Sequence, residues 1–390
     1  QELAFVVAAA VEYLRALTSG GVDIATSLAN IELRIAATAD QFATVAKIRA
    51  LRRVWARVAE ACGAPEAAAA TTIHAVTSRA MMTRYDPWVN SLRTTVACFA
   101  AGVAGADSIT VLPYDHAAPA DGSELGLRLA RNTQAVLALE SNLARVIDPG
   151  GGSWYVEHLT AALAAAAWSD FQEVEAAGGF AVAATSGLIR ERLAATWHER
   201  EAQIANRSSS ITGVSEFPDI DEVIASPPVR GSVAAEALPV HRYAEQFEQL
   251  RGRVDHAGAV TGHRPVVFLA ALGDLATSTA RIAYAKSFFE TAGVVTVTGP
   301  AGASPAEIID AFHQSDANVA CLCSSDAFYA EHAVHAAEAI KAAGATYLYL
   351  AGRPRALVDQ LEQAGVDRLI YTGCDVHATL AELLDVLEVP

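Results

Sequence analysis

Apolar residues recur at helical spacing along the first half of the chain, and short apolar runs separate these stretches. The periodicity predicts helices over residues 4–17, 41–62, 90–101 and 125–143. The apolar runs predict strands over residues 31–38, 71–77, 108–113 and 145–147. Strands that alternate with helices at regular spacing are typical of βα units in a parallel sheet or barrel.

Four βα units amount to half of an eight-stranded barrel. Half a barrel would expose two sheet edges and an open core, so it should not be stable by itself. Three interpretations remain: the units form an open sheet, the sequence lacks preceding strands, or another chain supplies them. The pattern does not choose among these.

A second pattern follows a stretch rich in proline and polar residues. We expect a first domain over residues 1–207, a linker over 208–263 with Pro227, Pro228 and Gly231, and a second domain over 264–390. Strands are predicted at 265–271, 294–298, 319–323, 346–351 and 368–371, with a last helix at 377–387. Five strands joined by helical crossovers predict a doubly wound parallel sheet with the order 2-1-3-4-5.

Composition narrows the functional classes. The formal net charge of −16 argues against nucleic-acid binding, and no apolar run reaches the length of a membrane span. Five scattered cysteines in a chain of 390 residues indicate reduced thiols, with Cys321 and Cys323 filling the core, and hence a cytoplasmic protein. The first residues lack the basic and small-residue features of a signal peptide.

Several blocks, in order, resemble the acyl-CoA mutase family, methylmalonyl-CoA mutase above all. They are AKIRALRRVW (46–55), RNTQ (131–134), VIDPGGGSWY (146–155), FQEVEAAGG (171–179) and ITGVSEF (211–217). The resemblance implies the C-terminal half of a (β/α)8 barrel, followed by a flavodoxin-like domain of the cobalamin-binding type. In that family the barrel encloses a CoA thioester and the second domain presents cobalamin to it.

The positions that would hold cobalt are altered. In the family, the turn after the first strand of the second domain carries Asp-x-His-x-x-Gly, whose His ligates cobalt. Aligned on Gly273 in the turn-like stretch 273–279, these positions are Leu275, Thr277 and Ala280. Leucine cannot orient a ligand, and threonine is a poor ligand for cobalt compared with imidazole.

The positions that would contact the cofactor tail are altered as well. The family's Ser-Ser-Leu is Ser324–Ser325–Asp326 here, and its Gly-Gly is Ala351–Gly352, followed by Arg353. We expect the larger Ala351 to narrow the groove for the cofactor tail, and Asp326 and Arg353 to place charges in it.

The barrel motifs diverge in the same way. His74 matches a substrate-binding His of the family, but the Gly that follows in the family motif is Arg79 here. The family's Gln-Ser-Leu-His-Thr-Asn run reads DSITVL at 107–112, and its aromatic run aligns on NIELRI at 30–35. His74 is therefore a weak candidate for ligand binding, and a structural role is the alternative.

Taken with the resemblance, these losses imply the non-catalytic subunit of a heterodimeric, adenosylcobalamin-dependent mutase. This chain would bind neither cofactor nor metal, and a large catalytic subunit would hold adenosylcobalamin and the acyl-CoA substrate. The alternatives are an active acyl-CoA mutase with atypical cobalamin binding, and a free-standing acyl-CoA-binding regulatory protein. Trp154, in a retained block, is expected to pack against the outer helices of the barrel.

Overall fold

A computed structural model describes residues 1–118, 123–222, 224 and 238–390. The chain divides into two compact units. The first comprises the described residues of the ranges 1–82, 87–197 and 227–242, and the second those of 83–86, 198–226 and 243–390. Residues 223 and 225–237 of the expected linker, with Pro227, Pro228 and Gly231, lie outside the described residues.

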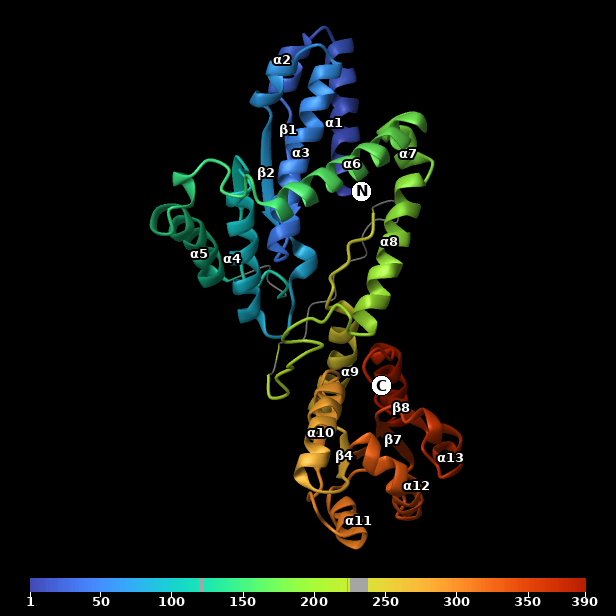
Figure 1. Ribbon diagram of the computed structural model, residues 1–390. Coiled ribbons are helices and arrows are strands. Elements are labelled where there is room, and N and C mark those ends of the chain that lie inside the picture. The colour runs from blue at the N-terminus through green and yellow to red at the C-terminus, as the bar shows by residue number, and fades with distance from the viewer. Residues whose placement is uncertain (119–122, 223, 225–237) are drawn as a thin grey trace. The chain divides into compact units, whose positions relative to one another are not determined.

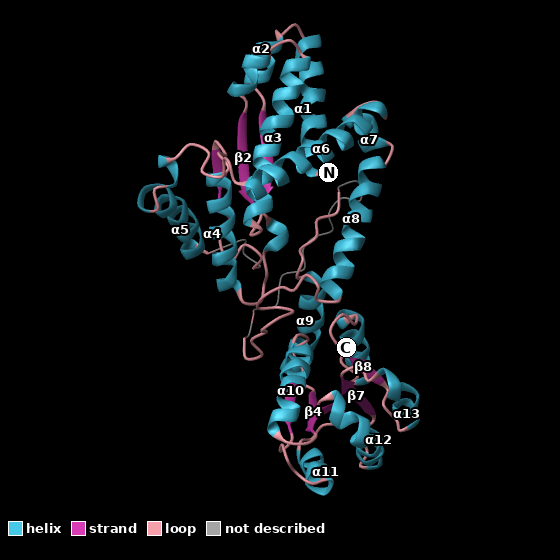
Figure 2. Cartoon of the chain, in the orientation of Figure 1, coloured by secondary structure: helices cyan, strands magenta, loops and turns pink. Residues whose placement is uncertain are grey.

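The first unit is built on a parallel sheet of three strands in the order β1-β2-β3 (Figures 1 and 2). Helices α1 and α4 contact the sheet, and α6 lies across α1 and α3. The elements up to the third strand are α1 (Glu2–Ser19), α2 (Ile24–Ala29), β1 (Glu32–Ala37), α3 (Gln41–Ala61), η1 (Pro65–Ala70), β2 (Thr72–Thr77), η2 (Arg79–Met81), α4 (Pro87–Val103) and β3 (Ser108–Thr110).

Alternation of side chains sets the two faces of this sheet. Leu33, Ile35 and Ala37 of β1 are buried on one face, while Glu32 and Arg34 are exposed on the other. Successive residues of a strand point to opposite faces, so one face forms the core with the helices and the other carries polar groups. The expected α/β class with parallel strands is confirmed.

The strand expected at 145–147 is not formed. Ile147 is 98% exposed, and Asn142 and Asp148, which flank the segment, have φ angles of 57° and 48°. A backbone in the left-handed region at both ends cannot continue as an extended strand. The third strand is also shorter than expected, because the Leu112 amide donates to the Thr77 hydroxyl at 2.8 Å and Pro113 has no N–H to donate.

The rest of the first unit is helical. The helix expected at 125–143 is interrupted: α5 (Glu124–Ala135) passes into a single π-helical turn, η3 (Val136–Glu140), and then η4 (Leu143–Arg145). The helices α6 (Trp154–Ala176), α7 (Phe180–Thr185) and α8 (Leu188–Ala205) follow. The expectation that Trp154 is packed is wrong, because this first residue of α6 is 93% exposed.

The second unit holds a five-stranded parallel sheet in the order β5-β4-β6-β7-β8, which confirms the predicted order. Its elements are α9 (Glu245–Thr261), β4 (Val266–Ala271), α10 (Leu275–Glu290), β5 (Val295–Thr298), α11 (Pro305–Gln314), β6 (Val319–Cys323), α12 (Asp326–Ala342), β7 (Tyr347–Ala351), η5 (Arg355–Leu357), α13 (Val358–Gln363), β8 (Arg368–Ile370) and α14 (Val376–Val386).

Helices cover both faces of this sheet. Phe268, Leu322 and Leu350 belong to a core that includes residues of α11, α12 and α13. The opposite face carries Tyr349, whose ring lies 5.3 Å from that of Phe289 of α10. On that face, the hydroxyl of Tyr347 also donates to Glu382 of α14 at 2.8 Å. Helices α10 and α14 therefore cover one face, and α11–α13 the other.

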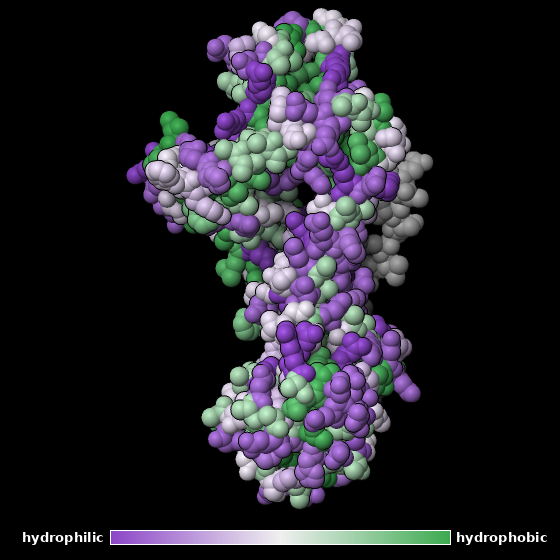
Figure 3. Space-filling view, turned by 45° about the vertical axis from the view of Figure 1, so that its right-hand side comes forward, coloured by the Kyte–Doolittle hydropathy of each residue, from purple (hydrophilic) through white to green (hydrophobic). Residues whose placement is uncertain are grey.

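Four of the five cysteines are buried, and Cys62 is exposed. All five cysteines are free, and the Sγ atoms of the buried Cys321 and Cys323 lie 3.9 Å apart. Hydrophilic residues spread over the visible face of each unit, with hydrophobic groups scattered among them (Figure 3). Among the described residues, no helix combines the length and apolar character that membrane crossing requires.

Candidate functional site

His74 lies on the polar face of the first sheet, within a small hydrogen-bonded group. Its Nε2 is 2.8 Å from the Thr110 hydroxyl, and its Nδ1 is 3.4 Å from a carboxylate oxygen of Glu32. The strand register brings the three together, because His74 pairs with Arg34 of β1 and with Ser108 of β3. Arg79 is exposed at the start of η2. His74 thus has structural partners on both ring nitrogens.

The side chains of the altered barrel motifs, at 107–112 and at Asn30, mostly make hydrogen bonds or packing contacts within the fold. Asp107 accepts from the Ile73 amide at 2.7 Å and pairs with Arg52 at 2.8 Å. Val111 and Leu112 are buried. Asn30 ends α2, and its side-chain amide donates to the carbonyl of Thr26. These positions hold the local fold together, so they offer few free polar groups to a ligand.

The turn after β4 is shorter than the sequence indicated. The stretch 273–279 was expected to be a turn, but α10 begins at Leu275, directly after Asp274. The Asp274 carboxylate accepts from the Thr277 amide at 2.8 Å and from the Thr277 hydroxyl. This N-cap satisfies the first turn of the helix, which is why the helix starts early. The same hydrogen bonds lower the pKa of Asp274 below its ordinary value.

The three positions that align with the cobalt-binding motif therefore lie on the first turns of α10. Leu275 and Ala280 are exposed, and the Thr277 hydroxyl already donates to Asp274. No imidazole is present at any of the three. Ligation of cobalt by an imidazole would need a free nitrogen donor at this place, and these three residues supply none.

An ion pair joins α10 and α12 beyond this turn. The guanidinium of Arg281 donates to Asp326 at 2.8 Å. Gly352, with a φ of 146°, lies against the same guanidinium: a Cβ on this residue would be 3.3 Å from Arg281 Cζ and from the Tyr329 ring. Arg281 and Asp326 thus occupy the space beside the end of β7.

Buried hydrogen bonds fix the surroundings of this pair. The Tyr329 hydroxyl accepts from the Ser324 amide at 2.7 Å and lies 3.0 Å from the carbonyl oxygens of Leu322 and Ala351. Burial raises the pKa of Tyr329. Ser325 caps α12 by accepting from the Phe328 amide. The ends of β6 and β7 are therefore held rigidly.

The charges expected to disturb the groove have partners. Asp326 pairs with Arg281, and the guanidinium of Arg353 lies 4.8 Å from the centre of the Tyr371 ring. The structure brings Ser325, Asp326, Ala351 and Gly352 together at the carboxyl ends of β6 and β7. Arg281, which the sequence reasoning missed, is the residue that joins them to α10.

These residues do not fit cobalamin. The ligand position is a threonine whose hydroxyl is used by a helix cap, and an ion pair lies where the tail groove is expected. In the described part of the chain, no group of three or more His, Cys, Asp or Glu side chains is arranged to hold a metal ion.

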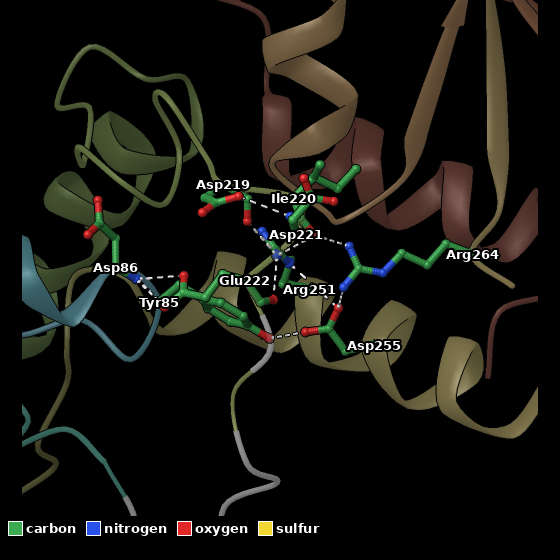
Figure 4. Close-up of polar contacts among 9 residues, drawn as sticks. All are labelled: Tyr85, Asp86, Asp219, Ile220, Asp221, Glu222, Arg251, Asp255 and Arg264. Atoms are coloured by element: carbon green, nitrogen blue, oxygen red, sulfur yellow. Dashed lines mark hydrogen bonds and ion pairs between the residues drawn. The ribbon is translucent and has the colours of Figure 1, made fainter. Parts of the chain in front are cut away.

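A second polar cluster lies on α9 (Figure 4). Arg251, 2% exposed, donates to the carbonyl oxygens of Asp219, Ile220 and Glu222 and lies 4.6 Å from the centre of the Tyr85 ring. The Tyr85 hydroxyl donates to Asp255 at 2.7 Å. The cluster attaches two loops to one helix.

Further contacts extend this cluster. Arg264 donates to Asp255 at 2.8 Å, and both carboxylate oxygens of Glu222 accept from the Asp86 amide. Burial raises the pKa of Glu222 above its ordinary value. The sequence signal that could have identified the cluster is the i, i+4 spacing of Arg251 and Asp255 on a helix.

Comparison with known proteins identifies the class to which this two-unit α/β chain belongs. The family profile of methylmalonyl-CoA mutase matches residues 1–259. The chain belongs to the methylmalonyl-CoA mutase family.

Individual relatives are similar over nearly the whole chain. The methylmalonyl-CoA mutase small subunit of Streptomyces virginiae is 51% identical over 391 residues, which cover 99% of this chain and 61% of the relative. The corresponding small subunit of Propionibacterium freudenreichii subsp. shermanii is 43% identical over 391 residues, which cover 100% of this chain and 60% of the relative. A methylmalonyl-CoA mutase of Cereibacter sphaeroides is 34% identical over 56% of this chain and 31% of its own length. The chain spans about three fifths of the length of the two small subunits.

Proposed function

We propose that this chain belongs to the small, non-catalytic subunit of a heterodimeric, adenosylcobalamin-dependent methylmalonyl-CoA mutase. The holoenzyme would interconvert methylmalonyl-CoA and succinyl-CoA. The relatives named as small subunits support the subunit type. The observation that carries the non-catalytic role is the turn after β4, where Thr277 is bonded to the helix cap and Arg281 pairs with Asp326.

The large subunit would hold both adenosylcobalamin and the acyl-CoA substrate. The small subunit would stabilise its partner by burying part of the partner's surface. We assign His74 a structural role in this subunit, because its two ring nitrogens face Glu32 and Thr110 within its own sheet. We place the assembly in the cytoplasm, in keeping with the five free cysteines.

Two measurements test this proposal. Adding the full-length subunit to free adenosylcobalamin should leave the absorbance spectrum of the cofactor unchanged. Mixing it with the large subunit should raise the activity or the thermal stability of that subunit. Co-purification from the native cell, followed by mass spectrometry, would identify the partner.

Other outcomes would favour the other functions. A spectral change on adding this chain alone would indicate a mutase with atypical cobalamin binding. A rise in melting temperature with CoA esters, in the absence of a partner, would indicate a free-standing acyl-CoA-binding protein. If addition of this chain changed neither the activity nor the stability of the large subunit, the assembly role would be wrong.

A further inference from the structure

The second unit contains a cavity that borders the altered turn at Gly273 and extends away from it along α11 and α12. Its volume is about 270 Å³, and it lies between α11 and α12 at the carboxyl end of β4. Apolar side chains such as Ile308 and Ile309 of α11 and Phe328 and Ile340 of α12 line it. On each helix the lining residues recur three or four positions apart, so each helix presents a continuous face to the cavity.

The position of the cavity in the sheet is one where ligands bind. Strand β4 pairs with β5 on one side and with β6 on the other, so the strand order reverses at β4. In open α/β sheets, ligands occupy the crevice outside the carboxyl ends of the strands at such a switch point. The cavity lies on the α11–α12 face, whereas Thr277 and Arg281 belong to α10 on the other face.

Gly273 connects the cavity to the end of β4. Its φ is 77°, and a Cβ at this position would lie 3.0 Å from the Phe328 ring. Only a residue without a side chain allows Phe328 to pack this close to the turn. The Phe328 ring in turn lies against the His332 ring, with ring centres 4.4 Å apart and the two planes tilted by 47°. These contacts define one wall of the cavity.

The polar side chains that line the cavity are two histidines. His332 and His335 lie three residues apart on α12 and are exposed at its edge. His332 Nε2 is 3.7 Å from the carboxylate of Glu331. An imidazole can donate a hydrogen bond to a carbonyl or hydroxyl oxygen of a ligand. An apolar cavity with a few convergent polar groups is the usual form of a small-molecule site.

Size and charge define the ligand. A volume of about 270 Å³ corresponds to about nine non-hydrogen atoms, if each takes the ~30 Å³ that a water molecule occupies in the liquid. The chain has a net charge of −16, and Glu331 lies beside His332, so a negatively charged ligand is disfavoured. A cationic ligand is disfavoured by the apolar lining.

We propose that this cavity binds a neutral, mainly apolar small molecule that carries one hydrogen-bond acceptor, which His332 and His335 contact. The inference is independent of the proposed function, because the lining contains none of the positions Leu275, Thr277 and Ala280 that align with the cobalt-binding motif. The ligand body would lie among the isoleucines and Phe328, and its acceptor oxygen would face the histidines.

Benzyl alcohol, toluene and benzoate are matched probes of this site. Titrations of the full-length protein, followed by ligand-observed NMR, should give saturable binding of benzyl alcohol that is tighter than that of benzoate. Replacing both histidines (His332→Ala with His335→Ala) should weaken the binding of benzyl alcohol about three- to tenfold, which corresponds to the loss of one hydrogen bond. The affinity for toluene should stay unchanged.

A cavity-filling variant tests the location. Ala339→Phe places a ring inside the cavity and should abolish saturable binding, while Ala330→Phe adds the same ring to an exposed position of α12 outside it. If Ala339→Phe does not fold, the location is tested by the double histidine variant, which should fold because it removes only exposed side chains. Equal binding to both phenylalanine variants would overturn the proposal. So would tighter binding of benzoate, or no saturable binding of any probe, which would leave an apolar side chain of a partner protein as the occupant.

Discussion

Two tryptophans of the first unit illustrate how burial decides the importance of a side chain. Trp55 of α3 is 2% exposed, and its indole N–H donates to the Thr71 hydroxyl at 2.8 Å. The Thr71 hydroxyl donates in turn to the Leu28 carbonyl at 2.9 Å. Trp154, at the start of α6, is 93% exposed. The two rings are chemically identical but differ in the surface that folding removes from water.

We therefore expect opposite results from the same substitution. Trp55→Ala should lower the free energy of unfolding by about 3–5 kcal/mol, because it leaves a cavity and removes the N–H that donates to the Thr71 hydroxyl. Trp154→Ala should change it by less than about 0.5 kcal/mol, as is usual for surface residues. Urea unfolding of the full-length chain measures both. A loss of more than about 2 kcal/mol for Trp154→Ala would show that its ring is buried in the folded protein.

At the scale of an element, the start of α10 determines what the turn after β4 can bind. Restoring the motif with Leu275→Asp, Thr277→His and Ala280→Gly should not produce tight cobalamin binding. Arg281 and Asp326 would still form an ion pair beside Gly352. The absorbance of added cobalamin should therefore stay unchanged with this triple variant. Binding in the micromolar range by the triple variant would show that the groove is open.

A fourth substitution isolates the contribution of the ion pair. Adding Arg281→Ala to the triple variant should give a measurable spectral change, because it removes the guanidinium that lies against Gly352. Adding Arg355→Ala, in the exposed turn η5, is the matched control and should have no effect. Equal spectra for the two quadruple variants would mean that Arg281 does not exclude the cofactor.

At the scale of the whole molecule, residues 83–86 stand out because they belong to the second unit while both flanking segments belong to the first. Figure 4 shows how α9 contributes to their anchoring: Arg251 lies against Tyr85, and Asp255 accepts from the Tyr85 hydroxyl. The Asp86 amide donates to Glu222, whose carbonyl accepts from Arg251. The buried guanidinium thus supports two loops at once.

Removing that guanidinium should loosen both loops. Arg251→Met leaves three partly buried carbonyl oxygens without their donor and should cost about 3–5 kcal/mol of stability. Hydrogen exchange should accelerate at the Asp86 amide. Arg253→Met is the control on the same helix, since Arg253 is partly exposed and bonds to Asp385 and the carbonyls of Val389 and Pro390. Unchanged exchange at Asp86 in Arg251→Met would contradict the role assigned to the cluster.

Hydrophobic periodicity was sufficient to predict most of the secondary structure. The five strands of the second unit and their order follow from buried apolar runs separated by helical crossovers, since parallel neighbours require such crossovers. The prediction failed where a short apolar run is compatible both with a buried strand and with an exposed loop. The apolar residues Val146 and Ile147 indicated a strand, but they are exposed between two left-handed residues. Burial depends on the rest of the chain and cannot be calculated from a local run.

The sequence alone was sufficient to show which chemical groups are present or missing at the motif positions. It showed that the turn after β4 carries Thr277 in place of histidine, and that five cysteines are too scattered for a disulfide framework. Only the tertiary structure revealed that Arg281 meets Asp326 and that α9 anchors residues 83–86. It also revealed the cavity between α11 and α12. These features join residues that are far apart in the sequence, so they exist only once the backbone has folded and brought the elements together.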